Sequence, residues 1–317
     1  TINPYASRSS WGSVGYIPLN TDNKHKAINN GVFLEDLISL DDKYRLLIGG
    51  RFDFYKFKTR NIADMTNSYK GHSFSPRVGL LWDFLPEHTA YASYSKSFAP
   101  YGGRGNIGIS IGDTTMLDLK PQNNEQYEIG LKSTWADNRF SSNLAIFQIE
   151  HNNIRYRPDP TNDPYTWAQR GKERSRGIEL NILGQIYENL YLRSSLGYMR
   201  AIIVNDKSNP LNEKLSLNNT TNWQGNVFLR YAKNDKWYVE SGVTGYSKRY
   251  SYQVNKTSVT DQHLPGFVRL DASAGYNFSE HAQITLAINN ILNKKYWRSD
   301  SRPGDERSFM INMHYTF

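Results

Sequence analysis

The sequence predicts an all-β protein, an antiparallel up-and-down transmembrane β-barrel, on three observations. First, segment after segment alternates apolar and polar residues with the two-residue period of a β-strand, whereas helical periodicity is nearly absent. Second, many of these segments run for about 11 residues or more, which suits a tilted strand that crosses a bilayer. Third, short and long connections alternate along the chain, so a meander would have all its short turns at one end.

About 13 strands are expected from the alternation. The clearest one places Val268 and Leu270 on one side and Arg269 and Asp271 on the other. In order along the chain, the approximate spans are 30–40, 44–58, 74–85, 89–99, 122–135, 139–156, 165–186, 190–203, 220–232, 237–250, 265–278, 282–293 and 306–317.

The connections between these strands are of two kinds. Tight turns are expected at 41–43, 86–88, 136–138, 187–189, 233–235 and 279–281, and long links at 59–73, 100–121, 157–164, 204–219, 251–264 and 294–305. This asymmetry is typical of outer-membrane barrels, which have short periplasmic turns and long extracellular loops. A soluble β-sandwich also alternates, but its strands are shorter, usually about 5–6 residues.

The last strand is amphipathic to its end. Its apolar row is Phe309, Ile311, Met313, Tyr315 and Phe317, and the intervening residues are mostly polar. A strand that seals a barrel in lipid would turn this row toward the acyl chains and place its last aromatic rings near an interface. The alternative interpretation, a buried edge strand of a soluble sheet, does not explain why the strand ends on an aromatic residue.

Composition excludes several other classes. The mean hydropathy is −0.66, and no apolar run reaches the roughly 18 residues that a transmembrane helix needs. The absence of cysteine excludes disulfides and thiolate metal sites. The net charge of +8 comes from Lys and Arg spread along the chain among Asp and Glu, which favours scattered surface charge over a nucleic-acid site.

No catalytic motif is found. The seven histidines show no H-E-x-x-H spacing, and the serines lack a G-x-S-x-G elbow. The glycines of 102–108 open no helix, so they indicate a flexible loop and not a phosphate cradle. We therefore expect a protein that is not an enzyme and has no metal site or cofactor of its own.

Several segments resemble the TonB-dependent siderophore receptors of Gram-negative outer membranes. They are, in the family's order, "FSPRVGLLWDFLPEHTAYASYSKSFAP", "LDLKPQNNEQYEIGLKSTW", "LAIFQIEHNNI", "RSRGIELNILG" and "INNILNKKYW" with "RSFMINMHYTF". Each segment alone is only moderately specific, but together they cover nearly the whole chain from about residue 30.

The resemblance implies a 22-stranded barrel around an N-terminal plug, with uptake of ferric chelates energised through the TonB complex. On this basis residues 30–317 are expected to form the C-terminal part of the barrel, and 1–29 the end of an extracellular loop. The plug domain with its coupling box is expected to be absent from the chain. The resemblance also implies that the barrel-assembly machinery reads the terminal aromatic residues Phe317 and Tyr315, in a protein integral to the outer membrane and in contact with its lipids and lipopolysaccharide.

Recognition of a ferric siderophore calls for Arg, which supplies charge, and for Tyr or Trp, which stack and donate hydrogen bonds. Such residues cluster at the long-loop side. The candidate ligand-binding residues are Tyr101, Arg104, Arg155, Tyr156, Trp167, Arg170, Arg249, Tyr250, Tyr252, Trp297, Arg298 and Arg302. Aromatic residues in these positions could also form the interfacial girdle, and the arginines could contact lipopolysaccharide phosphates.

Other functions stay open at this point. Haem and cobalamin uptake are alternatives within the family, and a passive diffusion porin or an outer-membrane enzyme are alternatives outside it. The segments "SFAPYGG" and "LKPQNNEQYE" differ from the "FRAP…NPNL" region typical of haem receptors, which favours a siderophore. Catecholate, hydroxamate and mixed chelates are not ranked by the sequence.

Overall fold

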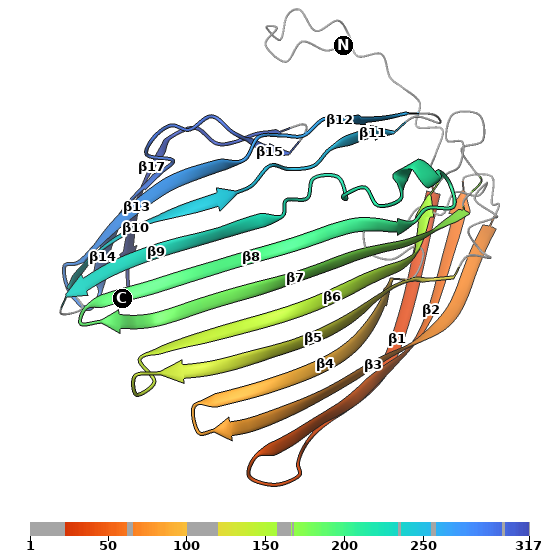
Figure 1. Cartoon of the computed structure of the whole chain (residues 1–317), viewed down its shortest axis with the longest axis horizontal. Helices are drawn as coiled ribbons and strands as arrows, with labels where there is room; N and C mark the ends of the chain where they lie inside the picture. Colours follow the sequence, from red (N-terminus) through yellow and green to blue (C-terminus); the bar gives the residue numbers. More distant parts are fainter. Residues whose placement is uncertain are drawn as a thin grey trace, which may run out of the picture.

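The computed structural model describes residues 23–61, 66–99, 120–156, 166, 168–233, 236–254, 258–299 and 302–316. Its main element is a 13-stranded sheet in which each strand is hydrogen-bonded to its neighbours in chain order. The pairings are antiparallel. The predicted up-and-down meander is thereby confirmed, and β1 and β17 are the two edge strands (Figure 1).

The strands of the main sheet have the following bounds: β1 Asn23–Ser39, β2 Tyr44–Asn61, β3 Thr66–Leu85, β4 His88–Ala99, β5 Gln122–Trp135, β6 Phe140–Tyr156, β7 Ala168–Tyr187, β8 Leu190–Asn205, β9 Trp223–Lys233, β10 Trp237–Tyr246, β13 Phe267–Asn277, β14 Ala282–Asn289 and β17 Ser308–Tyr315. Small elements occupy the long connections: the 3-10 helix η3 (Pro210–Asn212), the hairpin of β11 (Tyr252–Val254) with β12 (Val259–Asp261), and that of β15 (Trp297–Ser299) with β16 (Arg302–Pro303).

Burial along β2 shows why the alternating sequence forms a two-faced wall. Asp53 and Tyr55 are only 2% and 4% exposed, whereas the residues that alternate with them, Phe52 and Phe54, are 38% and 55% exposed. The sheet is curled (Figure 1), so side chains crowd together on the concave face and spread apart on the convex face. We call the concave side the inner face and the convex side the outward face.

The short turns lie along one edge of the sheet and the long connections along the opposite edge (Figure 1). The first turn has a local cause, because the Asp41 carboxylate accepts hydrogen bonds from the backbone N–H groups of Lys43 and Tyr44 at 2.7 and 2.8 Å. The turn after β5 is built by three consecutive residues with positive φ, Ala136, Asp137 and Asn138. Residues 234 and 235 of the predicted fifth turn lie outside the described residues.

Several expected boundaries are wrong. Strands β10 and β14 end at Tyr246 and Asn289, before the expected 250 and 293. Strand β1 begins at Asn23, so the end of the expected loop 1–29 is strand, and residues 1–22 lie outside the described part. The expected long link 59–73 is also mostly strand, because β2 continues to Asn61 and β3 starts at Thr66. The alternation of large and polar side chains runs on through 52–60, and the cross-strand pairs continue with it beyond the expected ends.

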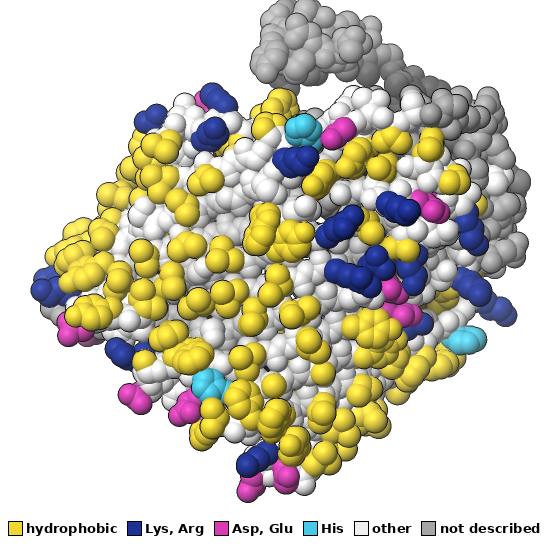
Figure 2. Space-filling view, viewed as in Figure 1, with side chains coloured by type: hydrophobic (Ala, Val, Ile, Leu, Met, Phe, Trp, Pro, Cys, Tyr) yellow, Lys and Arg dark blue, Asp and Glu magenta, His cyan; other side chains and the backbone are white. Residues whose placement is uncertain are grey.

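The outward face carries the apolar side chains. Val268, Leu286, Ile311 and Met313 are 62%, 47%, 68% and 74% exposed, as predicted, and Leu270 is half-buried on the same face. Figure 2 shows hydrophobic side chains over most of the visible surface, with charged ones gathered at the long-connection end and at the turns. In the described part of the chain, no helix is long or apolar enough to span a membrane.

We expect Ile311→Arg to reduce the amount of folded protein in the outer membrane, because it places a charge on the apolar row of β17. An arginine on the lipid face costs about 2–4 kcal/mol near the bilayer midplane. The measurement is the fraction of barrel that keeps its compact, heat-modifiable gel mobility. The neighbouring Asn312→Arg, which points to the inner face, is the control, and an equal loss in both variants would contradict the assignment of faces.

Candidate ligand-binding rim

The candidate site lies along the long-connection edge, which we call the rim. Three connections are described in most of their length there: 206–222 after β8, 247–266 after β10, and 290–307 after β14. Backbone hydrogen bonds join the first two connections, for example Tyr250 N to Thr220 O (2.9 Å), and brace the second one internally, for example Arg249 N to Leu264 O (2.9 Å). The third connection is bonded to β13 through Ile291 N and Leu270 O (2.8 Å). The rim therefore has an ordered backbone on which side chains can be positioned.

Arg249, Tyr250 and Tyr252 form one group on this rim. The rings of Tyr250 and Tyr252 stack at 6.2 Å with an interplanar angle of 13°. The Arg249 guanidinium lies 5.7 Å from the Tyr246 ring centre, and the Lys248 ammonium lies 5.0 Å from that of Tyr250. Cationic groups and aromatic rings thus lie in contact within this group.

Tyr252 also lines an open hollow of about 360 Å³ between the rim connections, together with Glu173, Asn212, Ser216 and Asn218. Its backbone N–H donates to the Asn218 side-chain oxygen at 3.0 Å. Burial, and to a lesser degree the Asp261 carboxylate, raises the pKa of the Tyr252 phenol. The phenol therefore stays protonated at neutral pH and can act as a hydrogen-bond donor.

Trp297, Arg298 and Arg302 form a second group on the β15–β16 hairpin. Trp297 is 45% exposed, and Arg302 is also exposed. Arg298 donates to the Asp305 carboxylate at 3.3 Å in a pair that is solvent-exposed on both sides. Such a pair contributes little to stability, so Arg298 is available to an anionic ligand.

The other candidate residues fall into two sets. Arg155 and Tyr156 are half-buried at the rim end of β6, opposite Gln169 and Ala168 of β7. Tyr101, Arg104 and Trp167 lie outside the described residues, as does the side chain of Arg170. Phe317 also lies outside them, whereas Tyr315 lies on the outward face of β17 and is 61% exposed.

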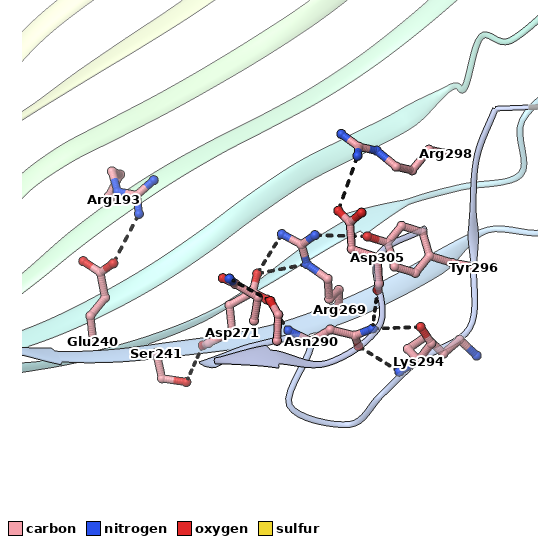
Figure 3. Close-up of polar contacts among 12 residues, drawn as sticks. Arg193, Glu240, Ser241, Arg269, Asp271, Asn290, Lys294, Tyr296, Arg298 and Asp305 are labelled. Atoms are coloured by element: carbon pink, nitrogen blue, oxygen red, sulfur yellow. Dashed lines mark hydrogen bonds and ion pairs between the residues drawn. The ribbon is translucent and has the colours of Figure 1, made fainter. Parts of the chain in front are cut away.

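A buried polar latch joins the last long connection to the barrel wall, and sequence reasoning missed it (Figure 3). Asn290, which is 1% exposed, donates its backbone N–H to Asp271 at 2.7 Å. Its amide side chain accepts from Lys294 N at 2.8 Å and donates to the carbonyls of Lys294 and Asp305, both at 2.9 Å. The stretch "NNILNKKY" belongs to the segments that carry the family resemblance. The spacing of its residues does not indicate that the Asn290 side chain closes the loop.

Tyr296 completes this latch from the other side. Its ring stacks on Phe267 at 4.2 Å, and its hydroxyl oxygen accepts a hydrogen bond from Arg269 at 3.1 Å. Arg269 also pairs with Asp271 at 3.0 Å, so Asn290 and Tyr296 of the connection are both linked to β13. The β15–β16 hairpin with Trp297 and Arg298 is thereby held at a defined position over the inner wall.

The inner face below the rim is polar and charged. Glu240 pairs with Arg230 at 3.0 Å and with Arg193 at 3.4 Å (Figure 3 shows the second contact). Arg51 and Asp53 repeat the arginine–aspartate spacing of 269–271, with a contact of 2.8 Å. The side of the alternation that holds Arg269 and Asp271, opposite Val268 and Leu270, is thus the inner face. Among the described residues, no group of three or more His, Asp or Glu could hold a metal ion.

Comparison with known proteins agrees with this architecture. The family model described as "TonB dependent receptor-like, beta-barrel" matches residues 2–291. The chain therefore belongs to this family of transport receptors, and it is located in the outer membrane.

Two curated relatives and one solved structure illustrate the similarity. The chain is 25% identical over 305 residues to the metal-pseudopaline receptor CntO of Pseudomonas aeruginosa, covering 92% of this chain and 41% of the relative. It is 27% identical to the ferrioxamine B receptor of Salmonella typhimurium, covering 89% and 39%. The structure of the siderophore receptor PiuA from Acinetobacter baumannii superposes with a TM-score of 0.80 at 22% identity, covering 93% and 44%. The chain thus spans about two-fifths of the length of these relatives.

We expect Asn290→Ala to loosen the connection after β14, because it removes three hydrogen bonds from a buried site. A cost of about 2 kcal/mol is the scale for such a loss, which makes local opening about thirty-fold more frequent. The measurement is the rate of tryptic cleavage after Lys294, Lys295 and Arg298 in the folded receptor. Asn289→Ala is the control, because that exposed side chain makes a single 3.3 Å bond to Ser308; equal cleavage rates in the two variants would refute the latch.

Proposed function

We propose that this chain is the C-terminal barrel part of a receptor that takes up ferric siderophores through the outer membrane, energised by the TonB complex. The observation that carries the proposal is the rim, where Arg, Tyr and Trp side chains stand on an ordered backbone above a charged inner wall. The names of the relatives, which include receptors for ferrioxamine B and ferripyoverdine, support a ligand of this class.

The chemistry of the rim suits a bulky chelate that is often anionic. The guanidinium groups of Arg249, Arg298 and Arg302 supply positive charge and planar hydrogen-bond donors. The stacked rings of Tyr250 and Tyr252, with Trp297, supply flat apolar faces. Iron enters this scheme only as part of the ligand, so we propose neither a resident cofactor nor a catalytic activity.

The barrel and the coupling to TonB require parts that we place outside this chain. The backbone edges of β1 and β17 are open in the 13-stranded sheet, and an open sheet edge is not tolerated in hydrocarbon. We propose that further strands of the same receptor close the barrel and that a plug domain fills it. The charged inner wall around Arg193, Glu240 and Asp271 would then face the plug.

The C-terminal strand is the part that we propose the barrel-assembly machinery recognises. The outward row of Phe309, Ile311, Met313 and Tyr315 is 61–74% exposed, and the sequence continues it to Phe317. The assembly machinery could bind such an exposed apolar row before the barrel closes.

We expect the triple variant Arg104→Ala, Trp297→Ala and Arg298→Ala of the complete receptor to assemble but to bind its chelate more weakly. Each desolvated charge-assisted contact is worth about 1.5–3 kcal/mol, so affinity should fall about ten- to a hundred-fold or more. The measurement is titration of purified receptor with ferric catecholate, hydroxamate and mixed siderophores.

Arg139→Ala serves as the matched control for this experiment. It removes an arginine from the turn edge, where the side chain donates a hydrogen bond to the Ala136 carbonyl at 3.1 Å, and it should leave affinity unchanged. If the triple variant kept the parent affinity for every chelate that the parent binds, these three residues would be excluded from the site.

We expect Phe317→Ser to lower the amount of receptor in the outer membrane more than the affinity of the receptor that does assemble. The physical reason is the loss of the aromatic end of the outward row. Surface abundance is measured by quantitative immunoblot of outer-membrane fractions, alongside chelate titration of the purified fraction. Normal abundance would count against the assembly role.

A further inference from the structure

Two arginines of the inner face, Arg193 of β8 and Arg230 of β9, lie against aromatic rings of the next strand. The Arg193 guanidinium lies 4.4 Å from the ring centre of Phe228 on β9, and the Arg230 guanidinium lies 4.1 Å from that of Tyr238 on β10. The face of an aromatic ring attracts a cation, so each ring holds its arginine against the wall. Both guanidinium groups thereby have a defined position on the inner face.

Two glycines let these rings lie close to the backbone. Phe228 is paired across the sheet with Gly242, and Tyr238 is paired with Gly275. A Cβ atom at either glycine would collide with the ring opposite it. The two arginine side chains on these rings remain 54% and 43% exposed. Glycine, ring and guanidinium therefore follow one another from the wall toward the interior, and the charged group is the one nearest to the interior.

The carboxylates that pair with the inner-face arginines are less exposed than the arginines themselves. The Glu240 side chain, which contacts Arg193 and Arg230, is 15% exposed. The Asp271 side chain is 10% exposed, whereas that of its partner Arg269 is 27% exposed. On the inner face of β8, β9, β10 and β13, as far as the structure describes it, these two carboxylates serve three guanidinium groups. This part of the wall therefore presents a surplus of positive charge to the interior.

Strand register places these arginines in a row that leads from the rim toward the turn edge. The pairings with inner residues of β10, read in that direction, are Arg269 with Thr244, Arg193 through Phe228 with Gly242, and Arg230 with Glu240. Above them, the Arg249 guanidinium of the rim lies 5.7 Å from the ring centre of Tyr246. Successive arginines are thus two residues of β10 apart, which is about 7 Å along the strand. We call Arg249, Arg269, Arg193 and Arg230, in this order, the arginine stripe.

The inner face of β4 to β7 carries the opposite charge at mid-strand. Strand register, followed from β2, places Glu128 and Glu179 on this face. Glu128 accepts hydrogen bonds from the Tyr91 hydroxyl at 2.6 Å and from the Gln126 amide at 3.0 Å, and both donors are uncharged. Lys132, which lies 5.1 Å from the Tyr91 ring centre, offsets only one of the two carboxylates. An anion inside the barrel is therefore attracted to the wall of β8, β9, β10 and β13 and repelled by the wall of β4 to β7.

We propose that the arginine stripe guides an anionic ferric chelate across the barrel, in the space between the plug and the wall of β8, β9, β10 and β13. The inference rests on the function proposed above and adds the charge class of the ligand and the wall that it follows. The chelate enters at Arg249 on the rim and moves past Arg269 and Arg193 to Arg230 near the turn edge. It is not trapped, because each guanidinium below the rim is partly neutralised by its carboxylate partner. Movement through a pore needs sites that are attractive enough to enter and weak enough to leave.

The first test separates transport from binding in the complete receptor. Arg193→Gln, Arg230→Gln and Glu240→Gln are combined, so that no buried carboxylate is left without its cations. The probes carry radioactive iron and are two anionic chelates, a ferric tris-catecholate and ferric citrate, and an uncharged ferric trihydroxamate. Energised uptake of an anionic chelate by intact cells should fall about tenfold, which is the scale on which a charged channel wall raises local ligand concentration. Affinity at the cell surface and any uptake of the hydroxamate should stay unchanged.

The matched control is Arg45→Gln, Arg77→Gln and Glu35→Gln. It removes the same three charges from the inner face of β1, β2 and β3, where Arg77 pairs with Glu35 at 3.4 Å. Uptake of the anionic chelates should be unchanged in this control. A second variant, Arg193→Lys with Arg230→Lys, keeps the charge of the stripe and should keep most of the uptake.

The outcomes distinguish this inference from the proposed function. If the parent imports no ferric chelate, the proposed function itself fails. If the parent imports only the uncharged chelate, or if the glutamine variant imports the anionic ones as fast as the control, the path along the stripe is overturned. It is also overturned if uptake of anionic and uncharged chelates falls equally, or if the lysine variant loses uptake as the glutamine variant does, because the arginines then act as plug contacts. If the glutamine variant does not assemble, Arg193→Gln alone decides by the same comparisons.

The second test locates the path by thiol labelling, since this chain contains no cysteine. Asn226→Cys places a thiol on the inner face of β9, opposite Thr244 of β10, and Ser93→Cys places one on the inner face of β4. Each is made in the complete receptor, with any other cysteine replaced, and is exposed in cells to a membrane-impermeant maleimide with and without energised uptake. Labelling of Asn226→Cys should rise severalfold during uptake, and labelling of Ser93→Cys should not. The reverse pattern, or equal labelling of the two, would overturn the path.

Discussion

The structure depends on one constraint, that each backbone N–H and C=O group inside a membrane must find a partner within the protein. The chain meets it with a single sheet in which every strand pairs with its neighbours in sequence. Because one sheet separates lipid from the interior, each strand has to serve two environments at once. The two-residue alternation is the direct consequence, and it is seen in the burial of Asp53 and Tyr55 beside the exposed Phe52 and Phe54.

The inner face satisfies its charges locally. Arg51 and Asp53 are neighbours on β2, and Arg269 and Asp271 are neighbours on β13. Glu240 of β10 is shared by Arg230 of the adjacent strand β9 and by Arg193 of β8, one strand further along the sheet. A wall assembled from such short-range pairs does not need the opposite side of the barrel for its own stability. The same network, through Tyr296 and Asn290, anchors a rim connection, so the wall also positions residues that we assign to ligand binding.

Charged side chains on the outward face, near the rim, are arranged in two ways. On β5 to β7 the lysines meet glutamates of the protein, whereas on β1 to β3 lysine faces lysine or arginine.

The sequence by itself determined the strand number of the main sheet, the meander and the facing of most residues, because a period of two and short polar turns are local properties that strand pairing preserves. It indicated the family through the segments that resemble those of TonB-dependent receptors. It also located Arg249, Tyr250 and Tyr252 on one rim connection. Only the tertiary structure decided how far β2 and β3 extend, that Asn290 and Tyr296 close a latch on Asp271 and Arg269, and that lysines of β1, β2 and β3 are paired across strands. These features depend on cross-strand register and on contacts between distant segments, which the spacing of residues along one chain does not specify.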